Sequence, residues 1–103
     1  MSDVLVTIKR AVLAGRFAFS EKARADMQAT GLTELDVVES IANAVAVYKR
    51  IRSTSPDRKV RREYLYVIQS PNLAGSIIYT KGKLVREEAE PSYYFLISSK
   101  RAD

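Results

Sequence analysis

The stretch that decides the fold is residues 44–52, AVAVYKRIR, where the spacing of the apolar residues changes. Before it, apolar residues recur three or four positions apart, which is typical of one face of a helix. Within it, Val47 and Ile51 alternate with Arg50 and Arg52, which predicts a strand with one apolar face. The chain therefore divides into a helical N-terminal half and a C-terminal half of strands.

Helix boundaries in the N-terminal half are marked by capping residues. Asp3, Ser20 and Thr33 each precede a segment with helical spacing, and all three residue types cap helix N-termini. Thr33 is followed three positions later by Asp36, a spacing similar to a capping box. Gly31 can end the second helix, because glycine tolerates the left-handed backbone found there.

These signals predict three helices, the first ending near Leu13, the second over residues 21–30 and the third ending near Ala44. Residues 16–19, RFAF, form a short connection that supplies two aromatic rings to the core. The predicted buried stripe of the third helix is Leu35, Val38, Ile41 and Val45.

The C-terminal half has the alternation of short strands. Turn-forming residues at 53–57, 70–75 and 86–91 separate four predicted strands, at 45–52, 60–69, 76–84 and 92–99, with Gly82 as a candidate break in the third. Short turns favour antiparallel pairing. We therefore expect a single α+β domain over residues 1–103, with the N-terminal helices packed on one face of a four-stranded antiparallel sheet.

The composition excludes several classes of protein. The chain of 103 residues has no apolar run long enough to cross a membrane and no secretory signal, so the cytoplasm is the default location. It has no cysteine and no histidine, which excludes disulfides, thiolate zinc sites and the usual general base of hydrolases. We expect no metal and no cofactor, and any proton transfer would fall to Glu, Asp, Tyr or Lys.

Positive charge and tyrosine are concentrated in the C-terminal half. Residues 1–47 hold five basic and six acidic residues, whereas residues 48–103 hold twelve basic and six acidic residues together with all six tyrosines. Residues 48–62, YKRIRSTSPDRKVRR, carry seven of those basic residues. Phosphates bind such cations and unpaired bases stack on aromatic rings, so this half favours a surface for RNA. The alternative is a solvated sheet face without a polyanion.

Several short motifs follow one another in a familiar order. Residues 15–20, GRFAFS, precede a helix that ends at Gly31-Leu32, and residues 47–49, VYK, enter the first strand; residues 65–68, LYVI, 78–82, IYTKG, and 96–100, LISSK, lie on the others. This order, over nearly the whole chain, resembles that of MqsR-type toxins in the RelE-like ribonuclease superfamily. The resemblance implies a toxin of a type II toxin–antitoxin system that cuts messenger RNA, free or on the ribosome, without metal.

The resemblance also implies the site. MqsR-type toxins use a Lys after the Tyr of the first strand, a Gln on the second, a Tyr on the third and a Lys on the last. By motif these positions are Lys49, Glu63, Tyr79 and Lys100, with Glu63 standing where Gln is expected. Candidate RNA-binding residues are Tyr48, Arg50, Arg52, Arg61, Arg62, Lys81 and Arg101. The implied partners are RNA and a cognate antitoxin protein.

The chemistry implied is attack of the RNA 2′-hydroxyl on the adjacent phosphorus. It needs a base for the 2′ proton, cations for the non-bridging oxygens and a proton for the leaving 5′-oxygen. Glu63 or a lysine could be the base, lysines and Arg62 could supply the charge, and Tyr79 the proton. Each residue also has an ordinary structural role, such as an ion pair for Glu63, core packing for Tyr79 or a solvated tail for Lys100.

Two other functions fit the same surface. A non-catalytic RNA-binding module needs the basic face but no proton donors, and a protein-interaction domain would bind an acidic partner there. A DNA-binding regulator fits less well, because the basic residues lie on predicted strands and loops rather than on a recognition helix.

Overall fold

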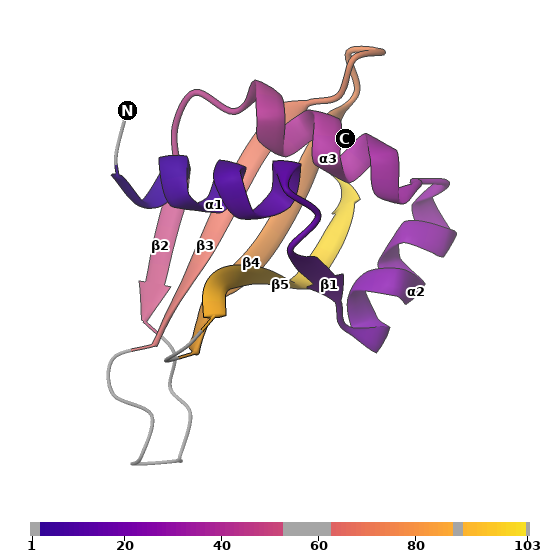
Figure 1. Cartoon of the computed structure of the whole chain (residues 1–103). Coiled ribbons are helices and arrows are strands. Elements are labelled where there is room, and N and C mark those ends of the chain that lie inside the picture. Colours follow the sequence, from indigo (N-terminus) through magenta and orange to yellow (C-terminus); the bar gives the residue numbers. More distant parts are fainter. Residues whose placement is uncertain (1–2, 53–62, 88–89, 103) are drawn as a thin grey trace.

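The computed structural model describes residues 3–52, 63–87 and 90–102, which form an α+β domain (Figure 1). In chain order its elements are α1 (Asp3–Leu13), β1 (Phe17–Phe19), α2 (Glu21–Thr30), α3 (Glu34–Asn43), β2 (Lys49–Arg52), β3 (Tyr64–Pro71), β4 (Ile77–Glu87) and β5 (Glu90–Arg101). The predicted loop at 53–57 and residues 60–62 of the second predicted strand lie outside the described residues. Among the helices described, none has the length and apolar character needed to span a membrane.

The sheet has five strands in the order β1-β5-β4-β3-β2 and is mixed, because β1 runs parallel to β5 while the other neighbours are antiparallel. The predicted α+β class is confirmed, but the prediction of a four-stranded antiparallel sheet is wrong. The extra strand is residues 17–19 of the predicted connection. Backbone N–H and C=O groups at a sheet edge need hydrogen-bond partners, and β1 supplies these partners to β5. The next residue extends this pairing, because Ser20 N–H donates to Leu96 O at 2.9 Å.

The predicted capping residues of α2 and α3 are confirmed. Ser20 Oγ accepts a hydrogen bond from Ala23 N–H, and Gly31 adopts a left-handed φ of 72°. Thr33 and Asp36 form a reciprocal capping box. The hydrogen bond from Thr33 N–H to the carboxylate is the main cause that lowers the pKa of Asp36.

The predicted buried stripe of the third helix is right at its centre and wrong at its ends, because Ile41 is fully buried and Val38 packs against the core, whereas the two outer residues are exposed. Leu35 and Val45 are 64% and 84% exposed, and α3 ends at Asn43, before Val45. The buried side chains of α3 are Val37, Ser40 and Ile41. A polar residue belongs to this stripe because Ser40 Oγ donates to the carbonyl oxygen of Ser70 at 2.7 Å, which satisfies both groups.

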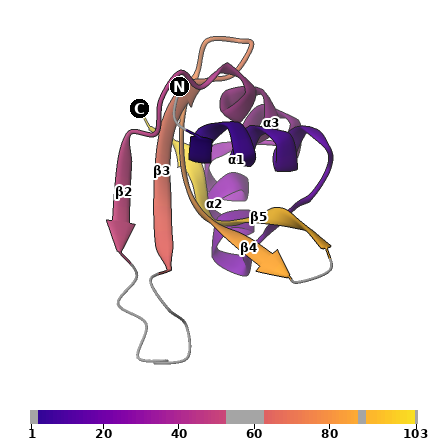
Figure 2. The ribbon, with the colours of Figure 1, turned by 60° about the vertical axis from the view of Figure 1, so that its left-hand side comes forward.

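The helices form a layer against one side of the sheet (Figures 1 and 2). α1 contacts β5 and α3, and α3 contacts β3 and β4. α2 lies along β5 beyond the end of β1, where Ser20 Oγ donates to Ile97 O and Lys22 Nζ to Ser98 Oγ. The core between these layers includes Leu5, Ile8, Phe19, Met27, Val37, Ile41, Ile68, Ile78, Tyr94 and Leu96.

Gly82 leaves room for the largest buried side chain. The ring of Tyr94 is fully buried against it, and a Cβ at position 82 would lie 2.6 Å from Tyr94 Cζ and 2.9 Å from the carbonyl oxygen of Phe95. Burial raises the pKa of the Tyr94 hydroxyl. The strand does not break at Gly82, but its register with β5 shifts between Lys81 and Gly82.

We predict that Gly82→Ala destabilises the fold by about 1–3 kcal/mol, because the methyl group overpacks the site. Urea unfolding monitored by circular dichroism measures the change. The control is Tyr94→Leu, alone and combined with Gly82→Ala. If the ring is the obstacle, the double variant loses less stability than the sum of the single changes. A Gly82→Ala protein as stable as wild type would contradict this packing.

Candidate functional site

The face of the sheet that α1 and α3 leave uncovered carries two neighbouring rows of polar side chains. Ile68 and Ile78 belong to the core under the helices. Because successive side chains of a strand point to opposite faces, Gln69 and Tyr79 lie on the other face, which we call the open face. Each row runs across the strands at one level, and together the rows contain three lysines.

The first row, called the tyrosine row, consists of Gln69, Tyr79 and Lys100. Tyr79 is paired with Gln69 on β3 and with Lys100 on β5, so one residue from each of three adjacent strands stands at the same level. Lys100 Nζ lies 5.5 Å from the centroid of the Tyr79 ring, a cation–π contact. Gln69 and Lys100 are exposed and Tyr79 is half-buried, so a ligand can reach all three.

The second row, called the lysine row, consists of Lys49, Val67, Lys81 and Ser98, one from each of the strands β2 to β5. Val67 is 2% exposed although it stands outside the core cluster. We attribute its burial to the aliphatic stems of its two cross-strand neighbours, Lys49 and Lys81, which leave their ammonium groups in water. At the end of the row, Lys22 of α2 donates to Ser98 Oγ at 2.9 Å.

The two rows are close enough to act on one extended ligand. They are two residues apart along each strand, about 7 Å, and neighbouring strands are about 4.8 Å apart. Lys22 Nζ forms a salt bridge with the Asp26 carboxylate at 3.0 Å, which partly neutralises its charge. The two rows themselves contain no carboxylate. Lys49, Lys81 and Lys100 therefore present a positive surface that suits the phosphates of a polyanion.

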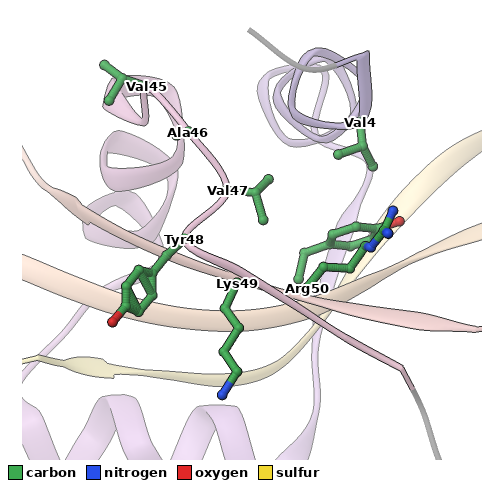
Figure 3. Close-up of a pocket in the computed structure, with 8 residues that line it drawn as sticks. Val4, Val45, Ala46, Val47, Tyr48, Lys49 and Arg50 are labelled. Carbon is green, nitrogen blue, oxygen red and sulfur yellow. The ribbon is translucent and has the colours of Figure 1, made fainter.

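The opposite face of β2 holds a separate basic and aromatic group. Arg50 is paired with Tyr66 and Arg52 with Tyr64, and the Arg50 guanidinium lies 4.6 Å from the centroid of the Tyr64 ring. Figure 3 shows the side chains of Lys49 and Arg50 leaving β2 in opposite directions. The structure thus separates Arg50 and Arg52 from the lysine row, as the alternation of a strand requires.

The remaining candidate RNA-binding residues are divided. Lys81 stands in the lysine row. Arg101 is paired with the core residue Ile78, on the helix side of the sheet, where its charge contributes to the lowered pKa of Asp36 after the larger effect of the Thr33 hydrogen bond. Tyr48 precedes β2 and is 65% exposed. Arg61 and Arg62 lie outside the described residues.

Glu63 stands apart from both rows. Its carboxylate pairs with Lys83 Nζ at 2.7 Å. It precedes β3 by one residue and is four residues from Val67 and six from Gln69, about 13 Å and 20 Å along an extended strand. The structure therefore brings Lys49, Tyr79 and Lys100 to one face but leaves Glu63 at a distance.

Gln69 is the residue that the sequence-based placement missed. It lies on β3, the second of the four predicted strands, where MqsR-type toxins are expected to have a Gln. The predicted turn at 70–75 does not give this pairing, because strands that end at Gln69 and begin at Ser76 would set those two residues opposite each other. In the structure β3 ends at Pro71 and β4 begins at Ile77, and counting outward from that pair sets Gln69 opposite Tyr79.

Acidic side chains are scattered over the structure. Within residues 3–52, 63–87 and 90–102, no three Asp or Glu side chains gather into a group that could hold a metal ion. The chemistry that the open face can supply comes from ammonium groups, one phenol and one amide.

Comparison with known proteins gave no relative. No family model matches the chain, and neither a curated protein nor a solved structure is significantly similar to it.

Proposed function

We propose that this protein is a metal-independent endoribonuclease, the toxin of a type II toxin–antitoxin pair, with its site on the open face. The observation that carries the proposal is the tyrosine row, in which Gln69, Tyr79 and Lys100 stand side by side next to the lysine row. This set reproduces in kind the Lys, Gln, Tyr and Lys expected from the resemblance to MqsR-type toxins. A small acidic antitoxin is the proposed protein partner, because it would neutralise the same surface.

The proposed reaction is an in-line transesterification. The 2′-oxygen of one nucleotide attacks the adjacent phosphorus, the bond from phosphorus to the 5′-oxygen breaks, and a 2′,3′-cyclic phosphate and a 5′-hydroxyl result. Lys100 and the lysine row stabilise the negative charge that develops on the non-bridging oxygens. The Tyr79 hydroxyl donates a proton to the leaving 5′-oxygen. Because neither row contains a carboxylate, the 2′ proton passes to solvent.

Positioning is the second contribution of the tyrosine row. The contact between Lys100 and the Tyr79 ring favours an arrangement in which the ammonium group lies beside the phenol ring. Gln69, on the other side of Tyr79, can hold a phosphate oxygen or the 2′-hydroxyl by hydrogen bonds from its amide group. Groups that are already in place avoid the cost of ordering them in the transition state.

Lys100→Ala and Tyr79→Phe should each abolish toxicity and lower cleavage of RNA by about 100-fold or more, because each removes a charge or a proton donor used in the transition state. The measurement is growth of a bacterial host on induced expression, with RNA integrity read from the same cultures. Arg10→Ala is the control, since it removes one exposed cation of α1, on the other side of the sheet. Equal toxicity of Lys100→Ala and wild type, or loss of folding in Lys100→Ala, would contradict the proposed role.

The position of Gln69 gives a second prediction. Gln69→Ala should reduce cleavage, whereas Glu63→Gln should leave the cleavage rate within about twofold and lower stability by about 1 kcal/mol or less through its pair with Lys83. Purified variants are compared on one single-stranded RNA under single-turnover conditions. The reverse result, with Glu63→Gln inactive and Gln69→Ala active, would move the catalytic group away from the tyrosine row.

The absence of a carboxylate from both rows supports one alternative, a non-catalytic RNA-binding module on the same fold. Such a module needs only the lysines and the aromatic rings. It predicts no toxicity and intact RNA from folded protein that still binds RNA.

A further inference from the structure

A pocket of about 490 Å³ lies on the other side of β2 from the lysine row. Figure 3 shows Val4 of α1 on one side of it and the segment that leads into β2 on the other. Its volume lies within the range of roughly 300–1,000 Å³ that is usual for sites that bind small organic groups. The residues that matter to its chemistry are Val4, Val47, Tyr48, Lys49, Arg50 and Tyr66.

The walls of this pocket are apolar, and two residues with flat, polar-edged side chains stand at its rim. Val4, Val47 and Tyr66 supply the apolar part and are half-buried against the core. Tyr48 and Arg50 stand at the rim; Tyr48 has 65% of its surface exposed, and Figure 3 shows its ring on the side of the chain away from Val47 and Val4. Aromatic rings and guanidinium planes are the groups on which unpaired nucleobases stack.

Tyr48 is held in place by its backbone. Its N–H donates to the carbonyl oxygen of Val67 at 2.9 Å, so the residue is fixed to β3 although it precedes β2. A large aromatic ring that is exposed on an anchored backbone loses little freedom when a base stacks on it. Arg50 is also restricted, because it already lies over the Tyr64 ring at 4.6 Å.

Lys49 connects the pocket to the open face. It lines the pocket, but its side chain belongs to the lysine row. A nucleotide with its phosphate at Lys49 can therefore place its base around the edge of β2, an edge strand of the sheet. The phosphates that follow would run across the lysine row toward Tyr79 and Lys100.

We propose that one unpaired nucleobase of a single-stranded RNA, whose phosphates lie on the open face, stacks on Tyr48 at the rim of this pocket. The inference deepens the proposed function by naming a base-binding subsite. It depends on RNA binding at the open face but not on cleavage, because a base bound at β2 is three strands from Lys100.

The test is the affinity for a fluorescent single-stranded 2′-O-methyl RNA, which cannot be cut because its nucleophile is blocked. Tyr48→Ala should weaken binding between about fivefold and 150-fold, the equivalent of about 1–3 kcal/mol for one stacked base. Tyr48→Phe should bind like wild type, because it keeps the ring. Arg50→Ala should weaken binding more than Arg52→Ala, its charge-matched control, which lies outside the pocket on the same face of β2. Inorganic polyphosphate, which has no bases, should bind wild type and Tyr48→Ala equally.

Two results would overturn the base pocket. One is a Tyr48→Ala protein that is folded by circular dichroism and binds the RNA as tightly as wild type. The other is an equal loss of affinity for RNA and for polyphosphate, which would assign Tyr48 to the electrostatic surface alone. Neither result would contradict cleavage at the tyrosine row, and an inactive but RNA-binding wild type would leave the pocket intact while removing the ribonuclease.

Discussion

The packing of the Tyr94 ring against Gly82 is the contact on which the candidate site depends. No side chain other than hydrogen fits at position 82 without moving Tyr94 or the backbone of Phe95. The register between β4 and β5 shifts at this point, between Lys81 and Gly82. A one-residue change of register turns each side chain to the other face of a sheet. The pairing of Tyr79 with Lys100 therefore depends on the register shift that accompanies the contact between Gly82 and Tyr94.

Local signals in the sequence predicted the elements well. The caps at Ser20, Gly31 and Thr33 depend on residues within one helical turn, so the α2 and α3 boundaries could be read directly. The alternation after Ala44 predicted the strands that became β2 to β5, and with them the α+β class. The buried stripe of α3 was harder, because Ser40 is buried through a hydrogen bond to Ser70, a partner that spacing alone does not show.

Features that depend on distant residues escaped prediction. β1 is a strand because β5 has an open edge, which residues 17–19 do not reveal by themselves. Lys49, Tyr79 and Lys100 could be named from motifs, but their common face required the register across β2 to β5. Glu63 was placed in the site by order along the chain, whereas the pairing of Gln69 with Tyr79 places Gln69 there.

The proposed path of the RNA joins the two faces of the sheet around the edge strand β2. In the proposed function the open face presents cations and a phenol to a phosphodiester, and Tyr48 at the rim of the pocket beyond β2 presents its ring to a base. The central claim of the proposed function is cleavage through the RNA's own 2′-hydroxyl.

The most direct measurement is to incubate purified protein with a single-stranded RNA in excess chelator and identify the product ends by mass spectrometry. The account predicts 2′,3′-cyclic phosphate and 5′-hydroxyl ends, with no cut where the nucleotide before the bond is 2′-deoxy. RNA that is bound but stays whole, or ends that carry a 5′-phosphate, would contradict it.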